Sequence, residues 1–136
     1  MSTKLIRSLY EQRLAMWAAA RSLPVAWQNV PFTPPASGIY LRAFLLPATT
    51  DSLDIEGAHR LYTGVFQVST VAQSGQGSGA AEQIAADLAE LFPLNLRLTS
   101  GSFIVQILSP CSRGPAVQDG SSYMIPVSFR YRADTA

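Results

Sequence analysis

Residues 61–92 read LYTGVFQVSTVAQSGQGSGAAEQIAADLAELF, and this stretch decides the fold. In its first part, residues 62–72, apolar and more polar side chains tend to alternate. The even positions hold Tyr62, Gly64, Phe66, Val68, Thr70 and Ala72, and the odd positions between them are more polar. Successive side chains of a strand point to opposite faces, so the pattern predicts a strand with one face on a core and a half-polar face opposite.

A glycine-rich turn and an amphipathic helix follow this strand. The turn, residues 74–79, reads Ser-Gly-Gln-Gly-Ser-Gly, which regular elements tolerate poorly. Apolar residues then recur at helical spacing, namely Ala80, Ala81, Ile84, Ala85, Leu88, Leu91 and Phe92. Pro93 ends the predicted helix. We expect the rest of the chain to cover this strand and helix.

The composition narrows the classes of function. The length of 136 residues predicts a single domain, 1–136. Only 14% of the residues are charged, against about a quarter in a typical soluble domain, which indicates a surface partly covered by partners. A net charge of +1 without a basic stripe argues against specific nucleic-acid binding. Cys111 is the only cysteine, so an internal disulfide or a cysteine metal cluster is excluded.

Neither a secretory signal nor a membrane span is predicted. Lys4 and Arg7 are followed by Glu11 and Arg13 and not by the apolar region of a signal peptide. No apolar run approaches the ~20 residues that a membrane helix needs. We therefore expect a protein made in the cytoplasm that has no contact with a membrane.

The N-terminal part predicts a helix, a strand and an irregular arm. The helix covers residues 2 to about 21, because Ile6, Tyr10 and Leu14 fall on one stripe. A strand is expected to begin at residues 25–28. Residues 29–35 contain three prolines, which forbid regular pairing and predict an extended arm.

Three further strands are expected. Residues 39–46 are apolar on both faces, which predicts a central strand that breaks at Pro47 and leads into a polar loop, residues 48–60. Residues 103–108 form the next strand. Residues 122–132 alternate most regularly, with Pro126 favouring an edge strand or a bulge. The predicted class is therefore α+β: a mainly antiparallel or mixed sheet of about five strands with two helices on one face, in the order α-β-β-β-α-β-β.

No set of residues in the sequence predicts catalysis, a cofactor or a metal ion. The glycines at 75, 77 and 79 have the wrong spacing for a dinucleotide fingerprint, and no lysine follows as in a P-loop, so a flexible turn is favoured over a phosphate site. His59 has no sequence partner for nucleophilic catalysis. Asp51, Asp54 and Glu56 lack the pattern of a calcium loop, which leaves a solvated acidic loop or a surface that faces a partner.

Two groups of residues are candidates for contact with a partner. Arg42, Arg130 and Arg132 form either an ordinary polar surface or a basic interface. The arm contains Trp27, Asn29, Pro31 and Phe32 and is expected to pack either on its own sheet or on a neighbouring subunit. Together with the acidic residues 51, 54 and 56, these form the candidate interface.

Several segments taken in order resemble a known family. They are VAWQNVPFTP at 25–34, YLRAFLLPA at 40–48, GVFQV at 64–68, the glycine-rich turn and the alanine-rich helix that ends at Leu91-Phe92. This ordered set resembles the small tail-terminator-like proteins of long-tailed bacteriophages, and the resemblance covers nearly the whole chain.

The resemblance implies a structural role in the virion tail, with assembly in the cytoplasm of the host bacterium. Such a protein would form a hexameric ring that caps the tail tube, ends its polymerisation and offers a surface for head joining. The partners implied are copies of the chain itself, the tail tube protein and a head–neck joining protein, and the genome would pass through the ring lumen. Two alternatives stay open: a head–neck connector ring, and a small ligand-binding domain that uses the Gly75–Gly79 turn.

Overall fold

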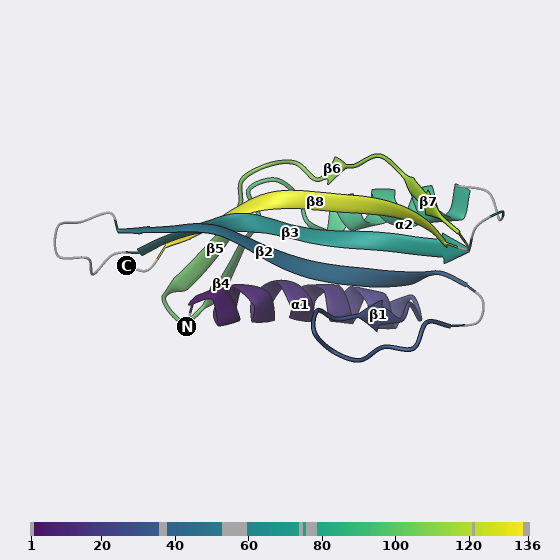
Figure 1. Ribbon diagram of the computed structural model, residues 1–136. Helices are drawn as coiled ribbons and strands as arrows, with labels where there is room; N and C mark the ends of the chain where they lie inside the picture. Colours follow the sequence, from purple (N-terminus) through teal and green to yellow (C-terminus); the bar gives the residue numbers. More distant parts are fainter. Residues whose placement is uncertain are drawn as a thin grey trace.

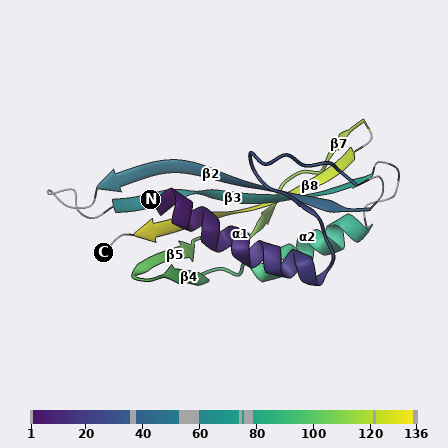
Figure 2. The ribbon, with the colours of Figure 1, turned by 90° about the horizontal axis from the view of Figure 1, so that it is seen from below.

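The computed structural model describes residues 2–35, 38–52, 60–73, 75, 79–120 and 122–134. Two helices lie on one face of a curled sheet (Figures 1 and 2). The elements in chain order are α1 (Ser2–Ala20), β1 (Val25–Ala26), β2 (Tyr40–Ser52), β3 (Arg60–Gln73), α2 (Gly79–Leu91), β4 (Arg97–Ser100), β5 (Phe103–Ile107), β6 (Ser112–Arg113), β7 (Val117–Asp119) and β8 (Ser122–Asp134).

The sheet is mixed and mainly antiparallel, which confirms the predicted α+β class. Its strand order is β1-β2-β3-β8-β5-β4, and β6 and β7 also pair with β8. Only β1 runs parallel to its neighbour, β2. The expected five strands and their order need correction, because the described residues form eight. The additional strands β4, β6 and β7 have four residues or fewer, too few for a clear alternation in the sequence.

Strand β2 continues beyond Pro47, where a break was expected, and ends only at Ser52. Two residues before the proline, the Leu45 N–H points away from β3, toward the side chain of Gln28. The position of Pro47 faces the same way, so its missing donor removes no hydrogen bond between β2 and β3. The register shifts between Pro47 and Thr50. The prediction of a loop from residue 48 is therefore wrong for residues 48–52.

The face of the sheet that carries the helices holds the core. Helix α1 turns its stripe of Ile6, Tyr10, Leu14 and Ala18 onto this face, and all four are buried. Tyr10 stands in an aromatic cluster with Phe66 of β3, Phe129 of β8 and Phe92 just after α2, with ring centroids 5.0–6.0 Å apart. Such ring pairs contribute about 0.5–1.5 kcal/mol each beyond their buried area. The cluster therefore joins both helical segments to the two long central strands.

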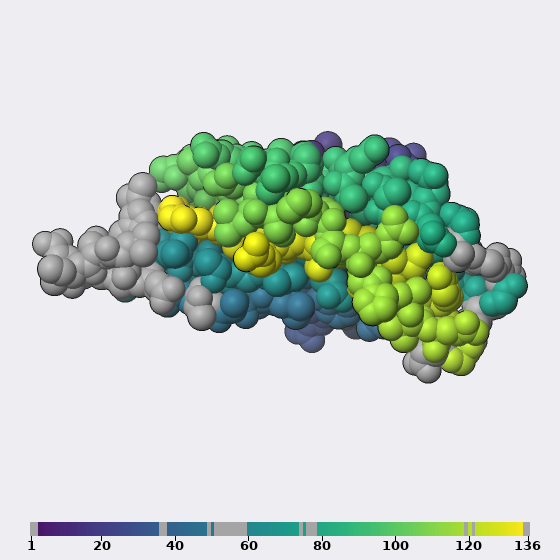
Figure 3. Space-filling model, turned by 90° about the horizontal axis from the view of Figure 1, so that it is seen from above, coloured from purple at the N-terminus to yellow at the C-terminus, as the bar shows by residue number. Residues whose placement is uncertain are grey.

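The helices cover only one face of strand β2, and its second face is not fully buried, contrary to the expectation of burial on both. Leu41, Ala43 and Leu45 point to the helices and are fully buried, whereas the side chain of Leu46 is 46% exposed. Tyr40, which shares the second face, is half-buried. Both helices lie against the same side of the sheet, so neither is left to cover the other side. Figure 3 views that second side.

Strand β8 is central, which corrects the edge-strand alternative predicted from Pro126. It pairs with β3 along one side and with β5, β6 and β7 along the other. The predicted alternation is confirmed, because Ile125, Val127, Phe129 and Tyr131 are buried. Pro126 lies where the ladder is interrupted between β6 and β7, and its carbonyl accepts a hydrogen bond of 2.9 Å from the Gly114 N–H. A residue without a donor is tolerated at such a gap.

Candidate assembly surfaces

The side chain of Gln28 hydrogen-bonds the arm after β1 (residues 27–35) both to the sheet and to helix α1. Its Oε1 atom accepts a hydrogen bond of 2.9 Å from the Leu45 N–H of β2 and one of 2.8 Å from the Arg7 guanidinium of α1. Strand β1 has only two residues, so the glutamine oxygen satisfies a β2 edge donor that lies beyond the end of β1. Gln28 thereby fixes the place at which the arm leaves the sheet.

The arm then turns at Asn29 and packs back on its own strand β2. Asn29 has a φ of +60°, a left-handed conformation in which asparagine is more common than most residues, and the Val30 N–H bonds to the Trp27 carbonyl oxygen at 3.2 Å. The Phe32 ring lies 5.1 Å from the Tyr40 ring, centroid to centroid. The half-buried Trp27 packs against the main core. Of the two expectations for the arm, packing on its own sheet is therefore met.

A groove remains between the arm and strand β2. Its volume is about 580 Å³, and it is lined by aromatic and proline side chains together with one cation. The lining residues used below are Trp27, Pro31, Phe32, Tyr40, Arg42 and Phe44. We call this the arm groove. Trp27, Asn29, Pro31, Phe32 and Arg42, five of the predicted interface residues, all line it, so the fold gathers them at one place.

Arg42 is the cation of the arm groove. Its guanidinium carbon lies 5.4 Å from the centre of the Phe44 ring. Arg42 forms no ion pair within 4.0 Å among the described residues. Four other arginines each pair with a carboxylate, namely Arg7, Arg21, Arg113 and Arg132. A half-buried guanidinium of this kind, beside apolar walls, favours a carboxylate ligand.

The other two predicted arginines lie elsewhere on the sheet. Arg130 and Arg132 are exposed on β8, and Arg132 pairs with Asp134 at 3.3 Å. Arg42 lies opposite Ser69 of β3, and Ser69 lies opposite Pro126 of β8. Four residues of strand, roughly 13 Å, separate that level of the sheet from Arg130. The three arginines therefore do not form one basic face.

Of the acidic candidates, Asp51 lies near the described end of strand β2. Asp51 pairs with Leu61 in the backbone register of the hairpin. Asp54 and Glu56, as well as His59, lie outside the described residues. The described ends of the hairpin, Ser52 and Arg60, project beyond the start of α1 (Figures 1 and 2).

Little of the glycine-rich turn supports a ligand site. Gly75 has a φ of +86°, as a turn requires, while residues 74 and 76–78 lie outside the described residues. The first turn of α2 carries Glu82, whose negative charge disfavours an anion at this helix N-terminus. Glu82 instead approaches Arg113 at 3.6 Å. The described residues also contain no group of three histidine, cysteine or acidic side chains placed to hold a metal ion.

Sequence reasoning missed three contributors to the arm groove, Gln28, Tyr40 and Phe44. Nothing in the sequence around Gln28 indicates its role, because that role depends on a contact with Leu45, seventeen positions further along the chain. The apolar pattern of residues 39–46 predicts Tyr40 and Phe44 as core residues on the second face of β2. A usable signal was their position on a strand beside a proline-rich arm.

The fold is an α+β arrangement with the arm groove beside the first half of β2 and the described end of the β2–β3 hairpin toward the other end of the molecule. The family model described as phage tail terminator protein matches residues 5–131, and the chain belongs to this family. It is a structural protein of the phage tail, from a family of structural proteins and not of enzymes. No helix in the described ranges is long and apolar enough to cross a membrane.

Solved structures agree with this fold. One, whose own name carries no functional description, has 50% identical residues and a TM-score of 0.83, covering 98% of this chain and 96% of the other. A chain from the virion of a native gene transfer agent particle has 20% identity and a TM-score of 0.60, with 95% and 94% covered. Among curated proteins, none matches the chain.

Proposed function

We propose that this protein forms a hexameric ring on the end of the tail tube, stops tube polymerisation and offers the surface to which the head joins. The observation that carries the proposal is the family match over residues 5–131. The partners proposed are further copies of the chain, the tail tube protein and a head–neck joining protein. The ring is assembled in the host cytoplasm, and the genome passes through its lumen.

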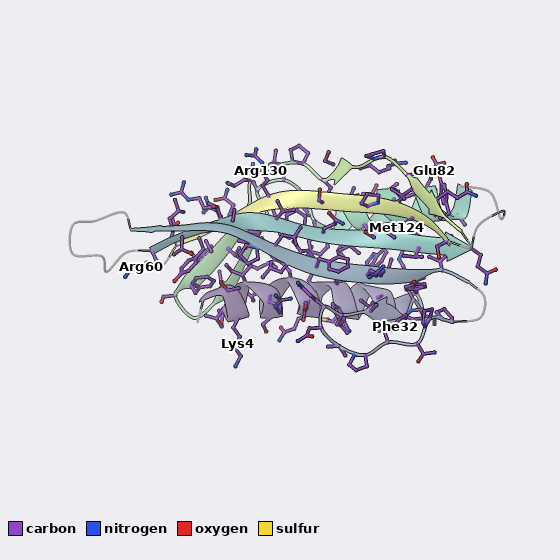
Figure 4. The ribbon with its side chains drawn as sticks, viewed as in Figure 1. Lys4, Phe32, Arg60, Glu82, Met124 and Arg130 are labelled. Carbon is purple, nitrogen blue, oxygen red and sulfur yellow. The ribbon has the colours of Figure 1, made fainter. Side chains whose placement is uncertain are left out.

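Two separate surfaces support a ring. Contacts that close a ring by rotation are head-to-tail, so each subunit must present two different and complementary surfaces. The arm groove lies beside β1 and the first half of β2, and the described end of the β2–β3 hairpin lies at the other end of the molecule (Figure 4). One surface is hollow and the other projects, which suits a repeated contact of one subunit with the next.

Tube length is the measurement that tests the capping role. Purified tail tube protein is polymerised with and without the chain, and tube lengths are measured by negative-stain electron microscopy. The expected result is tubes that shorten as the chain is added, with a ring-shaped density at one end. Unchanged lengths combined with binding to the isolated head connector would instead place the protein in the neck, which is the alternative ring position.

A further inference from the structure

The arm groove has the chemistry of a receptor for an apolar and acidic peptide. Its walls supply the rings of Trp27, Phe32, Tyr40 and Phe44, which bind apolar side chains. Arg42 supplies a guanidinium that has no ion pair among the described residues. A fitting segment would therefore alternate apolar side chains with carboxylates over a few residues.

This chain contains one such segment. Residues 51–56 read Asp-Ser-Leu-Asp-Ile-Glu, so Leu53 and Ile55 alternate with three carboxylates. Three of the nine acidic residues of the chain are gathered in these six positions. The nearest lysine or arginine that follows is Arg60, and none occurs between Arg42 and Asp51. The charge and the apolar content of this segment both complement the arm groove.

The described end of β2, which leads into this segment, lies far from the groove of its own chain. Strand β2 runs paired with β3 from Tyr40 to Ser52, and Ser52 is eight residues beyond Phe44. At about 3.3 Å per residue the strand carries Ser52 roughly 25 Å away from the groove. In Figure 4, Phe32 and Arg60 are labelled toward opposite ends of the molecule.

We propose that the arm groove of one subunit binds residues 51–56 of the next subunit in the ring. Leu53 and Ile55 would enter between the aromatic side chains, and a carboxylate of Asp54 or Glu56 would pair with Arg42. The contact joins two different surfaces of identical chains, so it is head-to-tail. The inference rests on the proposed ring, because it names the contact that closes it.

Site-specific crosslinking tests this contact on the full-length chain. A photoreactive benzoylphenylalanine replaces Phe44, and equal amounts of ¹⁴N- and ¹⁵N-labelled protein are mixed, irradiated and analysed by mass spectrometry. The expected product is a mixed-isotope adduct between position 44 and the peptide that contains residues 51–56. The matched control carries the same group at Ile104, an exposed position outside the groove, and should not label that peptide. Adducts to other peptides, adducts only within one chain, or no adducts would each overturn the proposal.

Charge variants test the ionic part of the contact. Arg42→Glu should lower the yield of the mixed adduct about tenfold, because it replaces an attraction with a repulsion. Arg97→Glu makes the same change of charge at an exposed residue of β4 and should leave the yield unchanged. Adding Asp54→Lys and Glu56→Lys to Arg42→Glu should restore it. An equal loss with Arg97→Glu, or a failure of the reversed charges to restore the yield, would contradict the assigned pairing.

The two proposals fail in distinguishable ways. Parent protein that shortens tubes but gives no adduct at residues 51–56 would refute the contact and leave the capping role standing. Protein that gives the adduct but leaves tube lengths unchanged would refute the capping role and leave the contact standing.

Discussion

Gln28→Met is the substitution that tests most directly how the arm is held. Methionine keeps the length and most of the volume of the side chain but removes the oxygen that accepts from Leu45 and Arg7. A backbone N–H left without a partner costs about 1–3 kcal/mol when it is shielded from water. Arg7 loses less, because its guanidinium is partly exposed and also approaches Glu11 at 3.6 Å. We expect the free energy of unfolding to fall by about 2 kcal/mol.

The assay is urea unfolding, followed by hydrogen exchange of the Leu45 amide. A loss of about 2 kcal/mol corresponds to a Tm lower by roughly 8 °C for a domain of this size. The Leu45 amide should exchange faster in the Gln28→Met variant. Gln28→Glu keeps an acceptor for both donors and should retain most of the stability.

The control is Gln12→Met, at an exposed glutamine of α1 whose side-chain amide donates a hydrogen bond of 3.4 Å to the Ser8 hydroxyl. It should change the stability by less than about 0.5 kcal/mol, as surface substitutions usually do. A Gln28→Met variant within that same margin, with the Leu45 amide still protected, would refute the assigned role of the side chain.

Four further predictions concern buried and half-buried residues of the fold. Gly64→Ala should lower the stability by about 1–3 kcal/mol, because the added methyl group would lie 2.6 Å from the Leu46 carbonyl oxygen. Gly79→Ala is the control, because its added methyl group meets nothing within 4 Å. Equal melting temperatures of the two variants in calorimetry would contradict this steric argument. Tyr10→Phe should raise the stability by about 1 kcal/mol in urea unfolding, because the buried Tyr10 hydroxyl has no hydrogen-bond partner in the described part of the chain. A loss of stability in this variant would show that the hydroxyl does have a partner. Burial raises the pKa of the Cys111 thiol from 9.0 to about 11, so iodoacetamide at pH 8 should label the folded chain about 10–100 times more slowly than the unfolded chain, and similar rates would contradict the shift. Because the unfolded thiol loses its proton first, Cys111 should make the stability fall as pH rises from 9.0 to about 11, and Cys111→Ala should reduce that slope.

The long elements and their buried faces were predictable from the sequence. The alternation from Tyr62 to Ala72 and the stripe of α1 each report a local period, and a local period depends only on which side of one element faces a core. The same reasoning predicted the buried side of β8 correctly. The resemblance to tail terminators added the family, which the match over residues 5–131 confirms.

Errors arose where a residue has a meaning only in relation to a neighbouring strand. Pro47 and Pro126 both lack a donor, and the sequence does not say which neighbour that donor would have faced. In the fold, Pro47 faces away from β3 and does not end its strand, and Pro126 faces a gap between β6 and β7 in a strand that is not at the edge. The second face of β2 was predicted to be buried because it is apolar, yet both helices pack on the other side.

For the candidate interface too, one part was predictable from the sequence and another depended on the tertiary structure. The sequence by itself determined the residue types: an aromatic and proline-rich arm, an acidic segment and a set of arginines, with no constellation for catalysis. Only the tertiary structure decided that Arg42 belongs with the arm, that Arg130 and Arg132 do not, and that Gln28 fastens the arm to the sheet. The physical reason is that strand register and the packing of helices on one face set these distances, and both depend on contacts between residues far apart in the chain.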